Sequence, residues 1–185
     1  MRKDFGAKPY TYPQPVFIVA TYDEAGVADA MNAAWGGTYD NDQVVLCLSP
    51  EHKTTQNILA RKAFVVSMAD AAHAAPCDYV GIVSGNKVAD KVARAGFHTE
   101  KSKFVDAPVI QELGLAMECE FVKTTEDGQV IGRVVNVSAD ESVLGADGKV
   151  DPEKLNVILY DGIQMTYRAV GPVVAQAFSA GKALK

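Results

Sequence analysis

Apolar and polar positions predict several short strands in the first part of the chain. Residues 16–22 form an apolar, β-branched run that ends in a polar turn, and residues 27–38 have the pattern of a second extended segment. Two extended segments joined by a short turn with Gly26 are typical of a hairpin. Residues 44–48 form a third apolar run, which stops before Pro50. The pattern therefore predicts three strands before the first helix.

The spacing then changes to one that favours helices. Residues 54–62 fit a short helix that begins with a threonine as N-cap and ends with basic residues, which suit the negative end of the helix dipole. Residues 64–68 have the pattern of another strand. The alanine-rich stretch that follows predicts two helices, over residues 75–83 and 88–95, with a break at residues 84–86.

The second half of the chain predicts mainly strands. Residues 97–113 are interpreted as a connecting segment, after which Met117, Cys119 and Phe121 alternate with two glutamates. This alternation predicts a half-buried strand whose Glu118 and Glu120 face water. A turn at residues 124–128 joins it to a strand over residues 129–139, and further strands are expected at residues 157–160, 165–170 and 172–178.

Such long hairpins indicate an antiparallel barrel or sandwich rather than a parallel α/β sheet. The chain has 185 residues, of which 48% are hydrophobic and 22% charged, and no linker divides it. We therefore expect one mainly β domain with short helices over residues 1–185. The glycines at residues 81–85 lack the dinucleotide-binding spacing, so no Rossmann domain is expected.

Charge and apolar runs limit the partners of this domain. Eighteen basic against 23 acidic residues give a net charge of -5, which argues against nucleic acid as a partner. The longest apolar run, residues 15–20, is too short for a membrane helix, and the first residues do not form a signal peptide. We expect a cytoplasmic protein without a membrane segment. Lys87, Lys91 and Arg94 are interpreted as one solvated helix face.

The cysteines and histidines do not form the spacing of a metal or disulfide site. The three cysteines are far apart, and Cys47 and Cys119 lie in apolar segments where inert buried thiols are common. The three histidines lack nearby carboxylates at metal-site spacing, so no metal centre is expected. These residues are Cys47, Cys77, Cys119, His52, His73 and His98.

The segment 49–57 is the first candidate for chemistry. It lies between a predicted buried strand and the start of a predicted helix, where unpaired backbone N–H groups and the helix dipole favour an anion. The ammonium group of Lys53 and the hydroxyl groups of Thr54 and Thr55 add to a site suited to phosphate. The other interpretation is a capped helix with a solvated lysine.

The segment 31–38 is the second candidate. It combines small residues, two glycines, Asn32 and the only tryptophan, Trp35. Small side chains let a flat ligand lie against the backbone, Asn32 can donate to and accept from a heterocycle edge, and Trp35 can cover a ring. The other interpretation is a bulged strand with a core tryptophan. Both segments together suit a phosphorylated aromatic heterocycle.

At this point the sequence resembles the flavin reductase-like FMN-binding split-barrel family, and within it the flavoredoxin branch. The resemblance extends in order over nearly the whole chain. The matching segments are PVFIV at 15–19, NAAW at 32–35, SPEHKTTQNI at 49–58, FVV at 64–66, Ser84-Gly85 with Asp90-Lys91, Ala107-Pro108, MEC at 117–119 and SAGK at 179–182.

The resemblance implies an antiparallel, Greek-key type split β-barrel that forms a homodimer and holds FMN near the subunit interface. By position, it implies that residues 31–35 line the flavin ring, that Ser49 and residues 52–54 hold the phosphate, and that Ser84, Gly85 and Lys91 approach from the helical segment. The cofactor-binding residues expected from the resemblance and the two segments are Met31, Asn32, Ala33, Ala34, Trp35, Ser49, His52, Lys53, Thr54, Asn57, Ser84, Gly85 and Lys91. No catalytic residue is expected, because the flavin carries the electron chemistry. By its charge, Lys91 is the candidate to stabilise reduced flavin.

The favoured function is therefore an FMN-dependent oxidoreductase that takes electrons from a reduced donor, with NAD(P)H or a redox protein as candidates. A flavin, a metal complex or a redox protein would accept them. The alternatives are an FMN electron-transfer module without enzymatic turnover, and a split barrel that binds haem or another planar ligand with His73 or His98 as axial ligand. A pyridoxamine phosphate oxidase is a weaker alternative, because its signatures are not recognised in this sequence.

Overall fold

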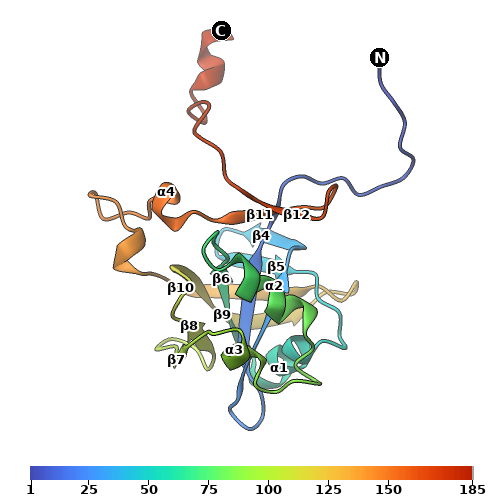
Figure 1. The fold of residues 1–185 in the computed structure, drawn as a ribbon, viewed down its shortest axis with the longest axis vertical. Coiled ribbons are helices and arrows are strands. Elements are labelled where there is room, and N and C mark those ends of the chain that lie inside the picture. Colours follow the sequence, from blue (N-terminus) through green and yellow to red (C-terminus); the bar gives the residue numbers. More distant parts are fainter. Residues whose placement is uncertain (185) are drawn as a thin grey trace.

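A seven-stranded antiparallel sheet, curled into a half-barrel, is the centre of the computed structural model, which describes residues 1–184 (Figure 1). This confirms the expected mainly β, antiparallel fold class with short helices. The strands, in spatial order, are β3 (Ala28–Ala33), β2 (Phe17–Tyr22), β6 (Ala63–Met68), β9 (Leu115–Thr124), β10 (Val130–Ala139), β5 (Gln43–Leu46) and β4 (Gly36–Asp40).

The two edge strands of this sheet, β3 and β4, follow each other in the chain. Only Ala34 and Trp35 separate them, so the predicted single strand over residues 27–38 is wrong. The Trp35 carbonyl accepts a hydrogen bond from Cys47 N at 2.8 Å, and Gly36 then pairs with Leu46. A Cβ on Gly36 would lie 2.7 Å from Val45 O, which is why the chain passes here with a glycine. Because only two residues join these edge strands, the two edges of the sheet lie next to each other.

Strand β2 is buried on both of its faces, which explains its continuous apolar pattern. Phe17 and Val19 point into the barrel, where they join Phe64 and Leu46. Ile18 and the other residues of its face are covered from outside by a second cluster. That outer cluster includes residues of α2 (Ala74–Ile82), α3 (Lys91–Arg94) and β8 (Pro108–Ile110).

Helix α1 (Lys53–Arg61) confirms the predicted helix but not its expected cap. The N-cap position is His52, and its side chain makes no capping hydrogen bond. Lys62 ends the helix in the left-handed conformation, with its N–H bonded to Ile58 O at 2.8 Å. The predicted helix at residues 75–83 is confirmed as α2, whereas the one at residues 88–95 shortens to α3.

The remaining elements flank the barrel. Residues 97–113 hold a small sheet of β7 (Thr99–Lys101) and β8 rather than only a connection. Strand β11 (Ile158–Asp161) pairs with both β1 (Gln14–Pro15) and β12 (Thr166–Ala169) in a three-stranded sheet. The short helices α4 (Pro152–Leu155), η1 (Glu141–Val143) and η2 (Ala180–Leu184) complete the described chain. None of the helices in residues 1–184 has the length and apolar character to cross a membrane.

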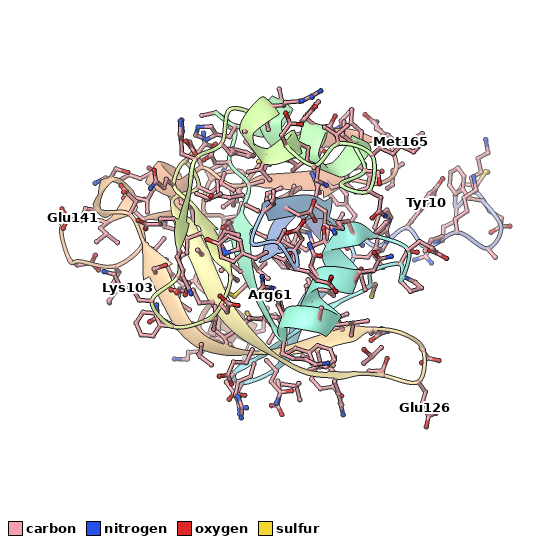
Figure 2. The ribbon with its side chains drawn as sticks, turned by 90° about the horizontal axis from the view of Figure 1, so that it is seen from below. Tyr10, Arg61, Lys103, Glu126, Glu141 and Met165 are labelled. Atoms are coloured by element: carbon pink, nitrogen blue, oxygen red, sulfur yellow. The ribbon has the colours of Figure 1, made fainter. Side chains whose placement is uncertain are left out.

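Both chain ends leave the body on the same side (Figure 1). Residues 172–178 form no strand, which corrects the expectation, because they lie in the terminal segment and pair with nothing in the sheets. Their apolar side chains, including Val173 and Phe178, are exposed. Tyr10 lies on the N-terminal segment, also away from the body (Figure 2).

Glu118 in β9 is buried, against the expectation that it faces water. It pairs with Asn136 across a register shift of β10, and Asn136 Nδ2 donates to Glu118 Oε1 at 2.6 Å. The Ser102 hydroxyl, from the segment after β7, donates to the other carboxylate oxygen. A neighbouring segment therefore covers this face of the strand, and local alternation cannot reveal such a cover.

Candidate functional site

Two adjacent cavities lie between β3, the start of α1, α2 and the β11–β12 hairpin. The first, here called the α1 cavity, has a volume of about 220 Å³. The second, here called the aromatic cavity, has a volume of about 250 Å³. Both are lined by Asn32, Gly81 and Ile82, so they share a wall. Only together do they reach the range of about 300–1,000 Å³ that small-molecule sites occupy.

The α1 cavity joins segments that are distant in the sequence. Eight of the thirteen expected binding residues line it: Met31, Asn32, His52, Lys53, Thr54, Ser84, Gly85 and Lys91. Asn32 also lines the aromatic cavity, together with Ala34 and Trp35. The two segments singled out by residue type thus meet at one site.

Three of the expected residues do not line either cavity. Ala33 packs inside the barrel, because it is the alternate position to Asn32 on β3. Asn57 is buried one turn into α1 and donates from Nδ2 to Thr21 Oγ1 at 3.1 Å. Ser49 donates its hydroxyl hydrogen to Glu51. These contacts assign them to the support of the site.

The start of α1 supplies donors for an anion. The helix has nine residues, and the N–H groups of its first turn have no partner within the helix. The Lys53 side chain is about one-third exposed, and its Nζ lies 3.8 Å from Asp23 Oδ2. This long contact leaves the ammonium hydrogens of Lys53 available to a ligand.

Asp29 is buried beneath the α1 cavity, where it contacts two of the residues that line it. The Lys91 Nζ lies 3.2 Å from Asp29 Oδ1, and Thr54 Oγ1 donates to Asp29 Oδ2 at 2.5 Å. Lys91 Nζ also donates to the carbonyls of Val80 and Val83, at 3.2 and 3.1 Å. The hydroxyl hydrogen of Thr54 and the ammonium of Lys91 are therefore already engaged.

The contact between Asp29 and Lys91 corrects two expectations. Lys91 is 2% exposed and paired with Asp29, so it carries no free charge toward a ligand and is not part of a solvated face with Lys87 and Arg94. Sequence analysis also missed Asp29. A single aspartate between two alanines of strand β3 was the signal that could have found it.

Two glycines allow the segments around the α1 cavity to approach closely. A Cβ on Gly81 would lie 2.7 Å from Asn32 Cβ, and one on Gly85 would meet Asp29 Oδ1 and lie 3.2 Å from Lys53 Cβ. No real Cβ fits at such distances without displacement of its neighbours. Because Gly81 and Gly85 have no side chain, the end of α2 and the turn after it can pack closely against β3 and α1.

Aromatic side chains line the other cavity. The rings of Trp35 and Tyr160 are 6.1 Å apart at 62°, and those of Tyr160 and Tyr167 are 6.2 Å apart at 56°. Trp35 is 59% exposed, so it forms a cavity wall and not part of the core. The Tyr167 hydroxyl donates to Asp78 Oδ1 at 2.7 Å. Burial, and then this carboxylate, raise the pKa of Tyr167.

Sequence analysis missed Asp78, Tyr160 and Tyr167. They lie on α2, β11 and β12, and their distance in sequence from Asn32 hides the contact. The sequence offered one signal for them, a tyrosine in each of the strands predicted near the end of the chain.

The donors and walls fit a planar, phosphorylated ligand. Lys53 and the α1 N–H groups suit a phosphate, and the aromatic cavity with the small residues of β3 suits a ring. The cavities adjoin at Asn32, Gly81 and Ile82, so one elongated molecule would lie across these residues.

Comparison with known proteins shows which structures share this fold. The structure is similar to flavoredoxin of Desulfovibrio vulgaris (Miyazaki F), with 36% identity, a TM-score of 0.94 and coverage of 98% of this chain and 100% of that one. Flavoredoxin from Methanosarcina acetivorans has 25% identity and a TM-score of 0.89 over 100% of both chains. An FMN-binding domain from Shewanella baltica OS155, at 20% identity, TM-score 0.77, and 88% and 89% coverage, shares the fold.

Among curated sequences, an uncharacterized protein of Aquifex aeolicus (strain VF5) is 24% identical over 159 residues, which are 79% of each chain. The split-barrel fold class is confirmed by the structural likeness. The model of the flavin reductase like domain matches residues 10–164, which is most of the chain and includes every residue that lines the two cavities except Tyr167. The chain therefore belongs to the flavin reductase like domain family.

Proposed function

We propose that the chain binds FMN across the α1 and aromatic cavities and acts as a flavin-dependent oxidoreductase. The observation that carries the proposal is that the donors suited to phosphate at the start of α1 and the wall of β3 suited to a ring border two adjacent cavities with three lining residues in common. The similarity to a flavoredoxin of 36% identity supports it.

In this assignment the phosphate group lies at the start of α1, where Lys53 donates charge-assisted hydrogen bonds to it. His52 and Ser84 border the same space. Asp29, Lys91 and Thr54 act one layer below, because their mutual contacts hold α1 and the end of α2 at a fixed separation. Trp35, Tyr160 and Tyr167 exclude water from the sides of the ring.

FMN supplies the hydride and single-electron chemistry when it is bound, so the chain itself needs no nucleophile. The residues around the cavities bind and orient the ring. Trp35 and Ile82, with exposed fractions of 59% and 75%, leave one side of the site open to a second molecule. We propose NAD(P)H or a reduced redox protein as donor, and a flavin, metal complex or redox protein as acceptor.

We further propose a homodimer. Apolar side chains extend from both termini without cover, among them Phe5, Tyr12, Val173, Val174 and Phe178. Both terminal segments leave the body on one side (Figure 1), so one second copy can cover both. Light scattering should give twice the chain mass, and removal of residues 172–185 should shift it toward one chain mass. A full-length monomer at micromolar concentration would contradict the homodimer.

The two histidines considered as haem ligands lie away from the proposed site. His73 Nδ1 lies 2.9 Å from Asp70 Oδ1, and His98 Nδ1 lies 2.6 Å from Glu112 Oε1. Neither histidine lines the α1 or the aromatic cavity. The FMN assignment therefore has the better geometric support.

An absorbance spectrum tests the proposed function. The purified protein is mixed with FMN and passed over a desalting column, and bands near 370 and 450 nm, about where flavins absorb, should be retained. Oxidation of NADH or NADPH by the loaded protein, with a ferric complex or free flavin as acceptor, then separates an enzyme from an electron carrier. Turnover supports the reductase, and flavin without turnover supports the carrier. A colourless protein would contradict both.

A further inference from the structure

The side-chain amide of Asn32 is held by two acceptors on one side. Its Nδ2 donates to Cys77 O and to Tyr167 Oη, both at 3.2 Å. A primary amide has two hydrogens on its nitrogen, so both are engaged. This corrects the expectation that Asn32 offers donors as well as an acceptor to a ligand.

The direction of this chain of hydrogen bonds is set by Asp78. A carboxylate accepts hydrogen bonds, and the Tyr167 hydroxyl donates its only hydrogen to Asp78 Oδ1 at 2.7 Å. The lone pairs of Tyr167 Oη are then the groups that face Asn32. A backbone carbonyl such as that of Cys77 also only accepts. Both neighbours therefore require the nitrogen of Asn32, and not its oxygen, on this side.

The opposite side of the amide carries Oδ1. Among residues 1–184, no group donates a hydrogen bond to it, while Asn32 lines both the α1 and the aromatic cavity. Gly81 lies so close that a Cβ there would be 2.7 Å from Asn32 Cβ, so helix α2 limits the movement of this side chain. The raised pKa of Tyr167 keeps its hydroxyl protonated at neutral pH, which preserves the direction of the chain.

We propose that Asp78 and Tyr167 are positioning residues that turn the Asn32 Oδ1 toward the ligand, so that the site selects a ring edge with an N–H donor. The inference rests on the proposed function and deepens it. The flavin ring has such an edge in both redox states and gains further N–H groups on reduction. A planar ligand whose edge carries only acceptors would meet the lone pairs of Oδ1 and be disfavoured.

Two substitutions test the inference with a matched control. Tyr167→Phe removes the hydroxyl that orients Asn32, and Asp78→Asn removes the group that fixes the direction of the Tyr167 hydroxyl. Tyr79→Phe is the control, because Tyr79 lies on the same helix and lines neither cavity. The dissociation constant of oxidised FMN is measured by flavin fluorescence, and the midpoint potential gives the affinity for reduced FMN.

We expect both test variants to bind FMN about tenfold more weakly in at least one of its two redox states. The affinity of the control variant should change less than twofold in both states. Riboflavin should be affected by the same factor as FMN, because the contact is with the ring and not with the phosphate. In the apoprotein of Tyr167→Phe, the side-chain amide resonances of Asn32 should lose protection from exchange. Where Asp78→Asn does not fold, Tyr167→Phe provides the test alone.

The outcomes separate the two proposals. Wild-type protein that binds neither FMN nor riboflavin overturns the proposed function, and the inference with it. Wild-type protein that binds FMN, together with folded variants that match it within twofold in both redox states, overturns the inference and leaves the proposed function intact. A selective loss for FMN but not riboflavin would also contradict a contact at the ring edge.

Discussion

Lys91 and Asp29 form a buried ion pair between α3 and β3, with Lys91 Nζ 3.2 Å from Asp29 Oδ1 and side chains that are 3% and 6% exposed. The pair connects the segment after α2 to the barrel beneath the α1 cavity. The Thr54 hydroxyl also donates to Asp29, and Lys91 donates to two carbonyls, one in α2 and one at its end. The geometry of the proposed phosphate site therefore depends on two charges that are paired with each other beneath it.

Loss of Lys91 should destabilise the fold strongly. Lys91→Met leaves the Asp29 carboxylate buried without its cation, and we expect a loss of about 3–5 kcal/mol in the free energy of unfolding. Urea denaturation measures it. The matched control is Lys149→Met, because Lys149 pairs with Asp147 in an exposed ion pair at 3.7 Å and should change little. Equal losses for both variants would show that the buried pair has no special role.

Lys53 should contribute to FMN affinity through the phosphate. We expect Lys53→Ala to weaken FMN binding by about 1.5–3 kcal/mol, tenfold or more, because a charge-assisted hydrogen bond is lost. Isothermal titration of the apoprotein measures it. Lys62→Ala, at the other end of α1, is the control and should bind like wild type. Riboflavin lacks the phosphate, so its affinity should not change. An equal loss of affinity for riboflavin would show that Lys53 does not bind the phosphate.

Gly81 should be intolerant of a side chain. In an exposed helix, alanine is about 1 kcal/mol more favourable than glycine, so propensity alone predicts that Gly81→Ala stabilises α2. The Cβ would instead lie 2.7 Å from Asn32 Cβ, and we expect lower thermal stability and weaker FMN binding. Gly37→Ala is the control, since a Cβ there meets nothing within 4 Å. A Gly81→Ala protein as stable as wild type would contradict the close packing.

Asp161 should make stability depend on acid pH. Its partial burial alone would raise the pKa of Asp161, but the hydrogen bond from Arg168 and those from the N–H groups of Gln164 and Ile163 lower it overall. A lowered pKa means that the ionised form stabilises the fold. This stabilisation is complete above the ordinary pKa of about 3.9 and disappears as the pH falls through the lowered value.

We therefore expect Asp161→Asn to lower the urea midpoint at pH 7 and to have a smaller effect at pH 3, below the ordinary pKa of an aspartate. Asp127→Asn, in the exposed β9–β10 turn, is the control and should match wild type at both values. An Asp161→Asn effect that is the same at both pH values would assign the role of Asp161 to shape and not to charge.

The three thiols should react at very different rates. Cys77 and Cys119 are buried, and desolvation raises the pKa of each to about 12. Cys47 is exposed, which corrects the expectation of a buried thiol, because it follows inward-facing Leu46 and points to the other side. With iodoacetamide at pH 8, mass spectrometry should show one fast modification on the native protein and three after unfolding. Fast labelling of three native thiols would contradict the core.

Local sequence patterns were sufficient for most of the strands and for α1. Residues 16–20 are apolar at every position because both faces of β2 are buried, so the burial can be recognised from residue type. The segments 31–35 and 49–57 were also recognisable, since helix starts, small residues and glycines have local physical meanings. The pattern failed where a segment distant in sequence decides whether a side chain is buried. Glu118, for example, is covered by the segment that contains Ser102.

Sequence alone therefore determined the fold class, the positions of the main strands and the two segments that border the proposed cofactor. Tertiary structure decided which side chains are free and which are already engaged. Asp29 with Lys91, and Asp78 with Tyr167 and Asn32, meet across long chain distances. The physical reason is that local periodicity reports whether a position faces protein or water, whereas the identity of its partner depends on how distant segments pack.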